Sequence, residues 1–138
     1  MENKHDPLIS IGIPTYNRPQ RLRKTLASIT CQTYSNLEII VSDNCSSDDE
    51  TQKVVQEFME TDPRIRYFRQ DENIGMFYNF KFVFDVSKGD YFTWVADDDA
   101  RSNDYIENCL NIFNEREPSA NLVLVNSYSQ LVDPDTNQ

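Results

Sequence analysis

The chain has 138 residues, of which 38% are hydrophobic, 12% aromatic and 26% charged, and this composition is typical of one globular domain. The 23 acidic residues outnumber the 13 lysines and arginines and give a net charge of −10. This balance argues against nucleic-acid binding, which needs a basic face, and against adhesion to an anionic membrane.

The cysteine and histidine content argues against a zinc site. Cys31, Cys45 and Cys109 are widely spaced and form no CxxC pair, and His5 is the single histidine. The N-terminus lacks the apolar core of a signal peptide, and no segment approaches the ~20 apolar residues of a transmembrane helix. We therefore expect free thiols and a cytoplasmic location.

Strand-like and helix-like segments alternate along the first part of the chain. Residues 8–13 form a short β-rich run, and the apolar positions of residues 18–32 fall on one helical stripe. Residues 37–42 predict the next strand. Ser47 and Glu50 have the spacing of a capping box, so we expect a second helix to begin there.

The alternation continues through the middle of the chain. Residues 65–69 predict a more polar strand, which we place toward an edge of the sheet. A third helix is expected to end near Gly89. It carries three aromatic residues on one side: Phe77, Phe80 and Phe84. Residues 90–96 then predict a buried apolar strand.

The last part of the chain completes the pattern. Ser102 is placed to cap a fourth helix, and residues 122–125 predict a final strand. Strands separated by helices of this length form right-handed βαβ units, so we expect a three-layer α/β/α fold with a mostly parallel sheet. We place the domain at residues 8–130, between tails at 1–7 and 131–138.

Three consecutive aspartates, Asp97, Asp98 and Asp99, follow the apolar strand at 90–96. Adjacent carboxylates repel one another, and a divalent cation such as Mg²⁺ or Mn²⁺ offsets that repulsion best. In open α/β sheets, ligands bind at the carboxyl ends of strands. The sequence therefore predicts a metal that holds a phosphate group. A solvated acidic loop is the alternative.

Polar segments follow each of the expected strands. In a parallel sheet they meet at one edge and form a pocket for a polar ligand; the alternative is that each is a turn or a helix cap. The chain has only three glycines and no Gly-rich phosphate loop, so phosphate would be neutralised by a cation, with Arg18 or Lys81 assisting. The four segments are residues 14–17, 43–46, 71–75 and 97–99.

Several motifs, in this order and spacing, resemble the start of family-2 glycosyltransferases of the GT-A fold, and they cover nearly the whole chain. They are IGIPTYNR at residues 11–18, QTY at 32–34, EIIVSDNCSSD at 38–48, NIG at 73–75, GDY at 89–91 and DDD at 97–99. The resemblance implies a Rossmann-like domain that binds a nucleotide sugar.

The resemblance also implies roles for particular residues. Thr15 and Tyr16 would border the base and ribose, and the Tyr16 ring could stack on the base. Asp43 would bind the base edge; the family usually has a second acid where this chain has Asn44. Asp98 matches the metal ligand of the DxD region, although the usual first acid of that pattern is replaced by Ala96.

The candidate residues fall into two sets. The donor-binding candidates are Pro14, Thr15, Tyr16, Asn17, Asp43, Asn44, Asn73, Asn79 and Asp97, and the metal candidates are Asp98 and Asp99. No residue of this chain is a catalytic candidate, because the general base and the acceptor-binding half of the family are expected downstream. We therefore expect weak donor binding and little or no transfer by residues 1–138 alone.

The resemblance implies an inverting, metal-assisted transfer from a nucleoside-diphosphate sugar to a glycan or lipid-linked acceptor in cell-surface polysaccharide biosynthesis. The longer protein would lie at the inner face of the membrane, and homodimer formation is left open. Two alternatives remain. One is a nucleotidyltransferase-like Mg²⁺-dependent enzyme, and the other is a non-catalytic metal- or nucleotide-binding domain such as a response-regulator-like phosphoacceptor.

Overall fold

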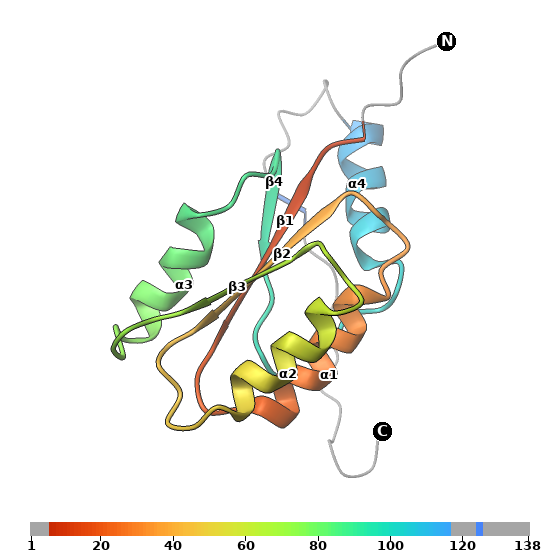
Figure 1. Ribbon diagram of the computed structural model, residues 1–138. Coiled ribbons are helices and arrows are strands. Elements are labelled where there is room, and N and C mark those ends of the chain that lie inside the picture. The colour runs from red at the N-terminus through yellow and green to blue at the C-terminus, as the bar shows by residue number, and fades with distance from the viewer. Residues whose placement is uncertain (1–5, 117–123, 126–138) are drawn as a thin grey trace.

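The computed structural model describes residues 6–116 and 124–125 (Figure 1). Strands and helices alternate throughout this part of the chain, as the sequence predicts. The elements are β1 (Ile9–Thr15), α1 (Pro19–Thr30), β2 (Leu37–Asp43), α2 (Glu50–Met59), β3 (Ile65–Arg69), α3 (Met76–Asp85), β4 (Tyr91–Trp94) and α4 (Tyr105–Arg116). Of the strand predicted at 122–125, residues 122 and 123 lie outside the described residues, and Leu124 and Val125 belong to no strand.

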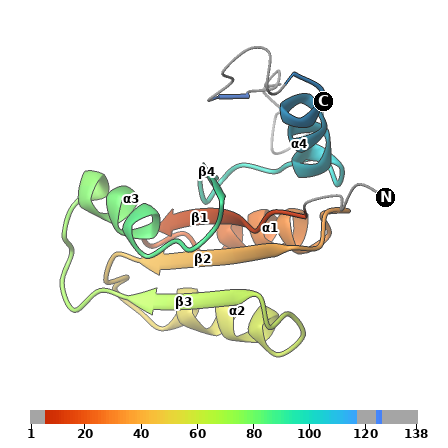
Figure 2. The same ribbon diagram turned by 90° about the horizontal axis from the view of Figure 1, so that it is seen from above.

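The four strands form one sheet in the order β3-β2-β1-β4, and every pairing between them is parallel (Figure 2). The whole of β1 pairs with the whole of β2, from Ile9 opposite Leu37 to Thr15 opposite Asp43. The prediction that β3 lies at an edge is confirmed. Because all strands are parallel, their carboxyl ends lie at the same edge of the sheet.

Helices cover both faces of the sheet, so the predicted three-layer α/β/α fold is confirmed. Side chains alternate between the two faces along a strand. Ile11 and Ile13 of β1 are fully buried in one hydrophobic cluster with Leu22, Leu26 and Ile29 of α1. Helix α4 adds Ile106 and Leu110 to the same cluster.

Helix α3 packs on the opposite face of the sheet, against β1 and β2 (Figure 1). A Cβ atom added at Gly12 of β1 would lie 2.7 Å from Val83 Cγ2 of α3 and 2.7 Å from Phe92 Cζ of β4. Only glycine fits this close approach. The three predicted phenylalanines of α3 do share one side, but Phe77 and Phe84 are exposed there, in a groove with Trp94.

The predicted capping box is wrong. Helix α2 begins at Glu50, and its N-cap residue is Asp49, which makes no side-chain cap hydrogen bond. Ser47 instead donates its backbone N–H and its hydroxyl to Asn17 Oδ1. This contact ties the loop after β2 to the loop after β1. Among the described residues, no helix has both the length and the apolarity to cross a bilayer.

Candidate functional site

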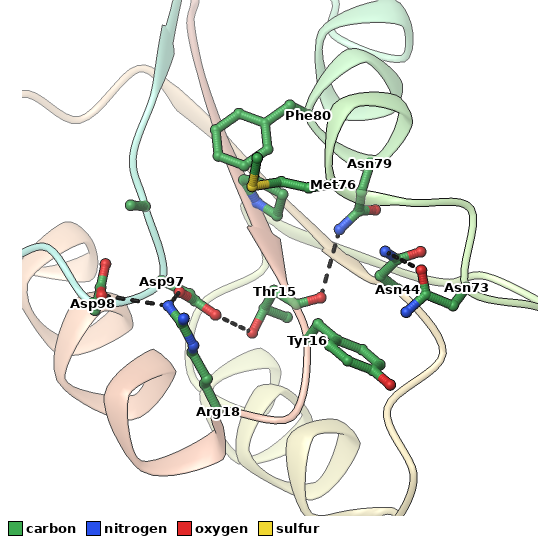
Figure 3. Close-up of a pocket in the computed structure, with 12 residues that line it drawn as sticks. Thr15, Tyr16, Arg18, Asn44, Asn73, Met76, Asn79, Phe80, Asp97 and Asp98 are labelled. Carbon is green, nitrogen blue, oxygen red and sulfur yellow. Dashed lines mark hydrogen bonds and ion pairs between the residues drawn. The ribbon is translucent and has the colours of Figure 1, made fainter.

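A pocket of about 530 Å³ opens where β1, β2 and β4 reach their carboxyl ends and where α3 begins (Figure 3). Parallel strands bring these segments together although they lie far apart in sequence: Thr15 and Asp97, which share a hydrogen bond, are 82 residues apart. The lining residues are Pro14, Thr15, Tyr16, Arg18, Asn44, Asn73, Met76, Asn79, Phe80, Ala96, Asp97 and Asp98.

A buried hydrogen bond fixes the wall between β1 and the segment after β4. Thr15 Oγ1 donates to Asp97 Oδ2 at 2.8 Å, and the two residues are 3% and 6% exposed. The pairing of β4 with β1 ends at Trp94 and Gly12. The Thr15 contact therefore holds the chain in place beyond the end of the sheet.

The acidic segment is paired with arginines. Arg18 Nη1 lies 3.2 Å from Asp97 Oδ1 and 3.3 Å from Asp98 Oδ2 (Figure 3). Arg21 Nη1 lies 3.2 Å from the same oxygen of Asp98. Arg101 lies 3.2 Å from Asp99, which does not line the pocket. Guanidinium groups thus supply positive charge that offsets the repulsion among the three carboxylates.

Three asparagines form the opposite wall. Asn79, at the start of α3, donates to the carbonyl oxygen of Ser42 and accepts from the Ser42 hydroxyl. Asn44 donates to Asn73 Oδ1 and accepts from the backbone N–H of Ile74. These contacts fix the position of the loop between β3 and α3.

Two uncharged side-chain groups of the lining remain free to meet a ligand. Tyr16 is 44% exposed, and its hydroxyl has no hydrogen-bond partner within the described part of the chain. The Nδ2 group of Asn73 also has no hydrogen-bond partner among the described residues, since both hydrogen bonds of this side chain are accepted by Oδ1. The pocket therefore offers an aromatic ring, a hydroxyl group and an amide donor.

Two of the predicted donor-binding residues do not line the pocket. Asp43 is fully buried: its Oδ1 accepts from the N–H and hydroxyl of Ser46, and its Oδ2 accepts from the Tyr67 hydroxyl. Burial, and then the carboxylate of Asp43, raise the pKa of Tyr67, so this tyrosine remains a proton donor. Asn17 has a positive φ of 54° and binds Ser47.

The structure therefore brings eight of the eleven candidates to one pocket and places Asn17, Asp43 and Asp99 outside its lining. Sequence reasoning did not select Met76 and Phe80, because their contribution depends on how α3 is placed. Of the two cations suggested as phosphate partners, Arg18 lines the pocket. Lys81 lines the neighbouring aromatic groove and pairs with Asp85.

The acidic pair fits a divalent cation with few protein ligands. Two carboxylate oxygens, from Asp97 and Asp98, converge on one position that a guanidinium nitrogen occupies. Among the described residues, no group of three or more Asp, Glu, His or Cys side chains could hold a metal. Mg²⁺ is commonly held by one or two carboxylates together with the phosphates of a substrate.

Comparisons with known proteins point to one family. The family model described as "Glycosyl transferase family 2" matches residues 10–138. The GalNAc(5)-diNAcBac-PP-undecaprenol beta-1,3-glucosyltransferase of Campylobacter jejuni is 43% identical over 94 residues, which cover 67% of this chain and 30% of that protein. The chain spans between 14% and 38% of the length of the curated relatives that it matches.

Solved structures show the same fold. TarS of S. aureus in complex with UDP superposes with a TM-score of 0.73 at 21% identity, over 78% of this chain and 32% of that chain. The mannosyltransferase PcManGT of Pyrobaculum calidifontis, in complex with GDP-Man and Mn²⁺, gives a TM-score of 0.70 at 23% identity, over 78% and 32%. The GT-A arrangement expected from the sequence is thereby confirmed.

Proposed function

Because this chain belongs to glycosyl transferase family 2, we propose that the pocket at the carboxyl ends of β1, β2 and β4 binds a nucleoside-diphosphate sugar. The observation that carries the proposal is the convergence of an exposed aromatic ring, free hydrogen-bond donors and a carboxylate–arginine cluster in one pocket. Family membership favours this function over a nucleotidyltransferase or a phosphoacceptor domain.

Each part of the donor has a chemically suitable partner in the pocket. The exposed ring of Tyr16 can stack on the base, and the free amide of Asn73 can donate to a carbonyl oxygen of the base or to a sugar hydroxyl. Asp43 and Asn44 use their polar groups within the protein, so we assign them the role of positioning these loops. Pro14, Thr15 and Asn79 complete the lining of the pocket.

We further propose that Asp98, with Asp97 beside it, holds Mg²⁺ or Mn²⁺ when the donor is bound. The ion would neutralise the charge of the diphosphate as it becomes the leaving group. The structural neighbour PcManGT, which holds GDP-Man and Mn²⁺, supports this choice of ion. The sequence-based hypothesis also included Asp99, which pairs with Arg101 instead of lining the pocket.

The acceptor side of the reaction is a separate proposal. Among the described residues, the pocket is lined by no carboxylate besides Asp97 and Asp98, and both are paired with arginine. We therefore propose that residues 8–130 bind the donor, and that a base from outside the described residues activates a glycan or lipid-linked acceptor. The proposal includes an inverting displacement, in which that base deprotonates the acceptor hydroxyl and the hydroxyl oxygen attacks the sugar directly.

We propose a cellular setting for the protein from its cysteines and its relatives. Cys31, Cys45 and Cys109 are free thiols, which supports a cytoplasmic location. The Campylobacter relative is named for a substrate linked to undecaprenol diphosphate, which supports work at the inner face of a membrane and a lipid-linked acceptor. Nothing in the described residues favours a homodimer over a monomer.

Calorimetric titration of UDP, GDP, CDP and dTDP, each with and without Mn²⁺, tests the donor proposal. We expect one nucleoside diphosphate to bind in a metal-dependent way, and Asp98→Asn to abolish the dependence on metal. Asp99→Asn is the matched control, because it removes a neighbouring charge that lies outside the pocket lining. If no nucleotide bound at millimolar concentration, the proposal would be wrong.

A further inference from the structure

Arg18 occupies the position at which two carboxylates of the pocket converge. Its Nη1 atom lies 3.2 Å from Asp97 Oδ1 and 3.3 Å from Asp98 Oδ2 (Figure 3). The other oxygen of Asp97 already accepts from Thr15. A divalent cation that used these two carboxylate oxygens would have to approach the place of this guanidinium group.

The side-chain contacts of Arg18 are few, and the one with Asp98 is exposed to solvent while the one with Asp97 is partly buried. Its side chain is 50% exposed, and its only hydrogen bonds in the described part of the chain are the two to the aspartates. Arg64, by contrast, binds Asp62 and also two backbone carbonyl groups. The exposed pair with Asp98 contributes little stability. The buried Asp97 keeps its hydrogen bond from Thr15, and an arriving cation would offset its charge, so Arg18 can leave at low cost once that cation is present.

The helix that carries Arg18 makes this position electrostatically unusual. Arg18 is the N-cap residue of α1, and Arg21 lies in the first turn. The first turn contains no acidic residue, although the partial positive charge of a helix N-terminus favours anions there. Two arginines at this end concentrate positive charge beside the pocket. That charge is unfavourable for the helix N-terminus but would attract an incoming diphosphate.

We propose that Arg18 is an exchangeable cation: it neutralises Asp97 and Asp98 before the donor binds, and it moves to the diphosphate of the donor when a divalent metal takes its place. This inference rests on the proposed function of the pocket. A planar guanidinium group matches phosphate oxygens in a bidentate way, and two cations at one position repel each other. Release of Arg18 and binding of the metal therefore favour each other.

One consequence is that metal and nucleotide bind cooperatively. In the absence of nucleotide, a metal must displace Arg18 without giving it a new partner. With nucleotide present, the diphosphate accepts Arg18 and supplies further oxygen ligands to the metal. The coupling is reciprocal, so metal raises the affinity for nucleotide by the same factor as nucleotide raises the affinity for metal.

Arg21 provides a matched comparison. It binds the same oxygen of Asp98 at 3.2 Å, but it does not line the pocket. Loss of Arg21 removes an ion pair with Asp98 but keeps Arg18, which is the residue that would move to the diphosphate. Its effect on nucleotide affinity should therefore be small.

The test measures two affinities in the wild type, Arg18→Gln and Arg21→Gln. Binding of Mn²⁺ alone is followed from the EPR signal of the free ion, and binding of UDP and GDP at saturating Mg²⁺ is followed by calorimetry. For Arg18→Gln we expect Mn²⁺ alone to bind about three- to tenfold more tightly. We expect the nucleotide recognised by the wild type to bind at least about tenfold more weakly. Arg21→Gln should leave nucleotide affinity within about twofold of the wild type.

The opposite signs of the two changes distinguish exchange from a structural role. A residue that only supports the loop would weaken both affinities when removed, and that result, or no change in either, would overturn the inference. If Arg18→Gln does not fold, Arg18→Lys carries the test: it keeps the charge, so Mn²⁺ affinity should stay near the wild-type value while nucleotide affinity falls. Failure of the wild type to bind any nucleotide would instead refute the proposed function, and the Mn²⁺ measurement would still decide whether Arg18 excludes metal.

Discussion

The two faces of the sheet are covered in different ways. On the face under α1 and α2, the contact is made by aliphatic side chains such as Ile11 and Val41, which are fully buried with Leu26. On the face under α3, the strands present Gly12, Ser10 and Glu38. Here hydrogen bonds and one close approach accompany the apolar contacts of Ile40 and Val83, which are also fully buried.

This difference separates stability from function. The aliphatic face supplies the apolar burial that holds the fold together. The polar face holds α3 at a defined height, because Asn79 binds both polar groups of Ser42 on β2. Its first turn can then bring Met76, Asn79 and Phe80 to the pocket. A helix positioned by directional bonds places side chains more accurately than one positioned by apolar contact alone.

The largest effect is expected on the aliphatic face. Leu26→Ala removes a fully buried side chain from the cluster between α1 and the sheet. We expect the free energy of unfolding, measured by urea denaturation, to fall by about 2–5 kcal/mol. A loss below about 1 kcal/mol would mean that α1 contributes little to the core, and the contrast between the faces would fail.

On the polar face, the strongest expected effect comes from Glu38. Its carboxylate accepts from the Ser10 hydroxyl at 2.6 Å, from Arg66 at 3.0 Å and from the backbone N–H of Lys88. Replacement by glutamine places amide hydrogens against these donors. We expect Glu38→Gln to lower the free energy of unfolding at pH 7 by about 1.5–3 kcal/mol.

The pH dependence of this loss identifies its cause. Burial alone would raise the pKa of Glu38, but hydrogen bonds from Ser10, the Lys88 backbone and Arg66 outweigh it and lower the pKa below the usual range. The stabilisation is therefore present above about pH 4.3, the usual value for Glu, and is lost as the pH falls through the lowered pKa. The difference in the free energy of unfolding between the wild type and Glu38→Gln should therefore become smaller at acidic pH. Glu57→Gln, at an exposed ion pair with Arg23, is the control and should leave no measurable gap.

Gly12→Ala tests the close approach on the same face. The new methyl group would lie 2.7 Å from Val83 Cγ2 and 2.7 Å from Phe92 Cζ. Overpacking is partly offset because alanine loses less backbone entropy on folding, so we expect a net loss of about 1–2 kcal/mol in urea denaturation. Val83→Ala in the same chain should remove one overlap. If the two substitutions proved additive, α3 would not approach the strand as closely as described.

Much of this fold could be predicted from local sequence patterns. Apolar stripes and short β-rich runs located all eight described elements, because such patterns have the period of the element that they form. Helix ends were less predictable. The Ser47 and Glu50 spacing suggested a cap, but the side chain of Asn17, 30 residues away, takes the polar groups of Ser47. A local rule cannot anticipate such a long-range partner.

The placement of residues around the pocket could be predicted where their position in the chain alone decides it. Thr15, Tyr16, Asp97 and Asp98 lie at or just beyond the carboxyl ends of strands, so the parallel sheet brings them together. The sequence could not show which polar groups already have hydrogen-bond partners within the protein. Asp43 has the position expected of a ligand-binding acid, yet its oxygens are satisfied by Ser46 and Tyr67.

The smallest effect is expected at the outer side of α3. Phe77 is 71% exposed and lines a groove with Phe84 and Trp94, so its ring buries little surface in the folded chain. We expect Phe77→Ala to change the free energy of unfolding by less than about 0.5 kcal/mol, against several for Leu26→Ala, although the two positions are both apolar members of a helical stripe. Burial therefore separates two residues that hydrophobic periodicity treats alike. The measurement should be made at two protein concentrations. A loss of stability above about 1 kcal/mol that appears only at the higher protein concentration would mean that two chains associate through the outer side of α3. Phe77 would then be buried in that association and not exposed to solvent.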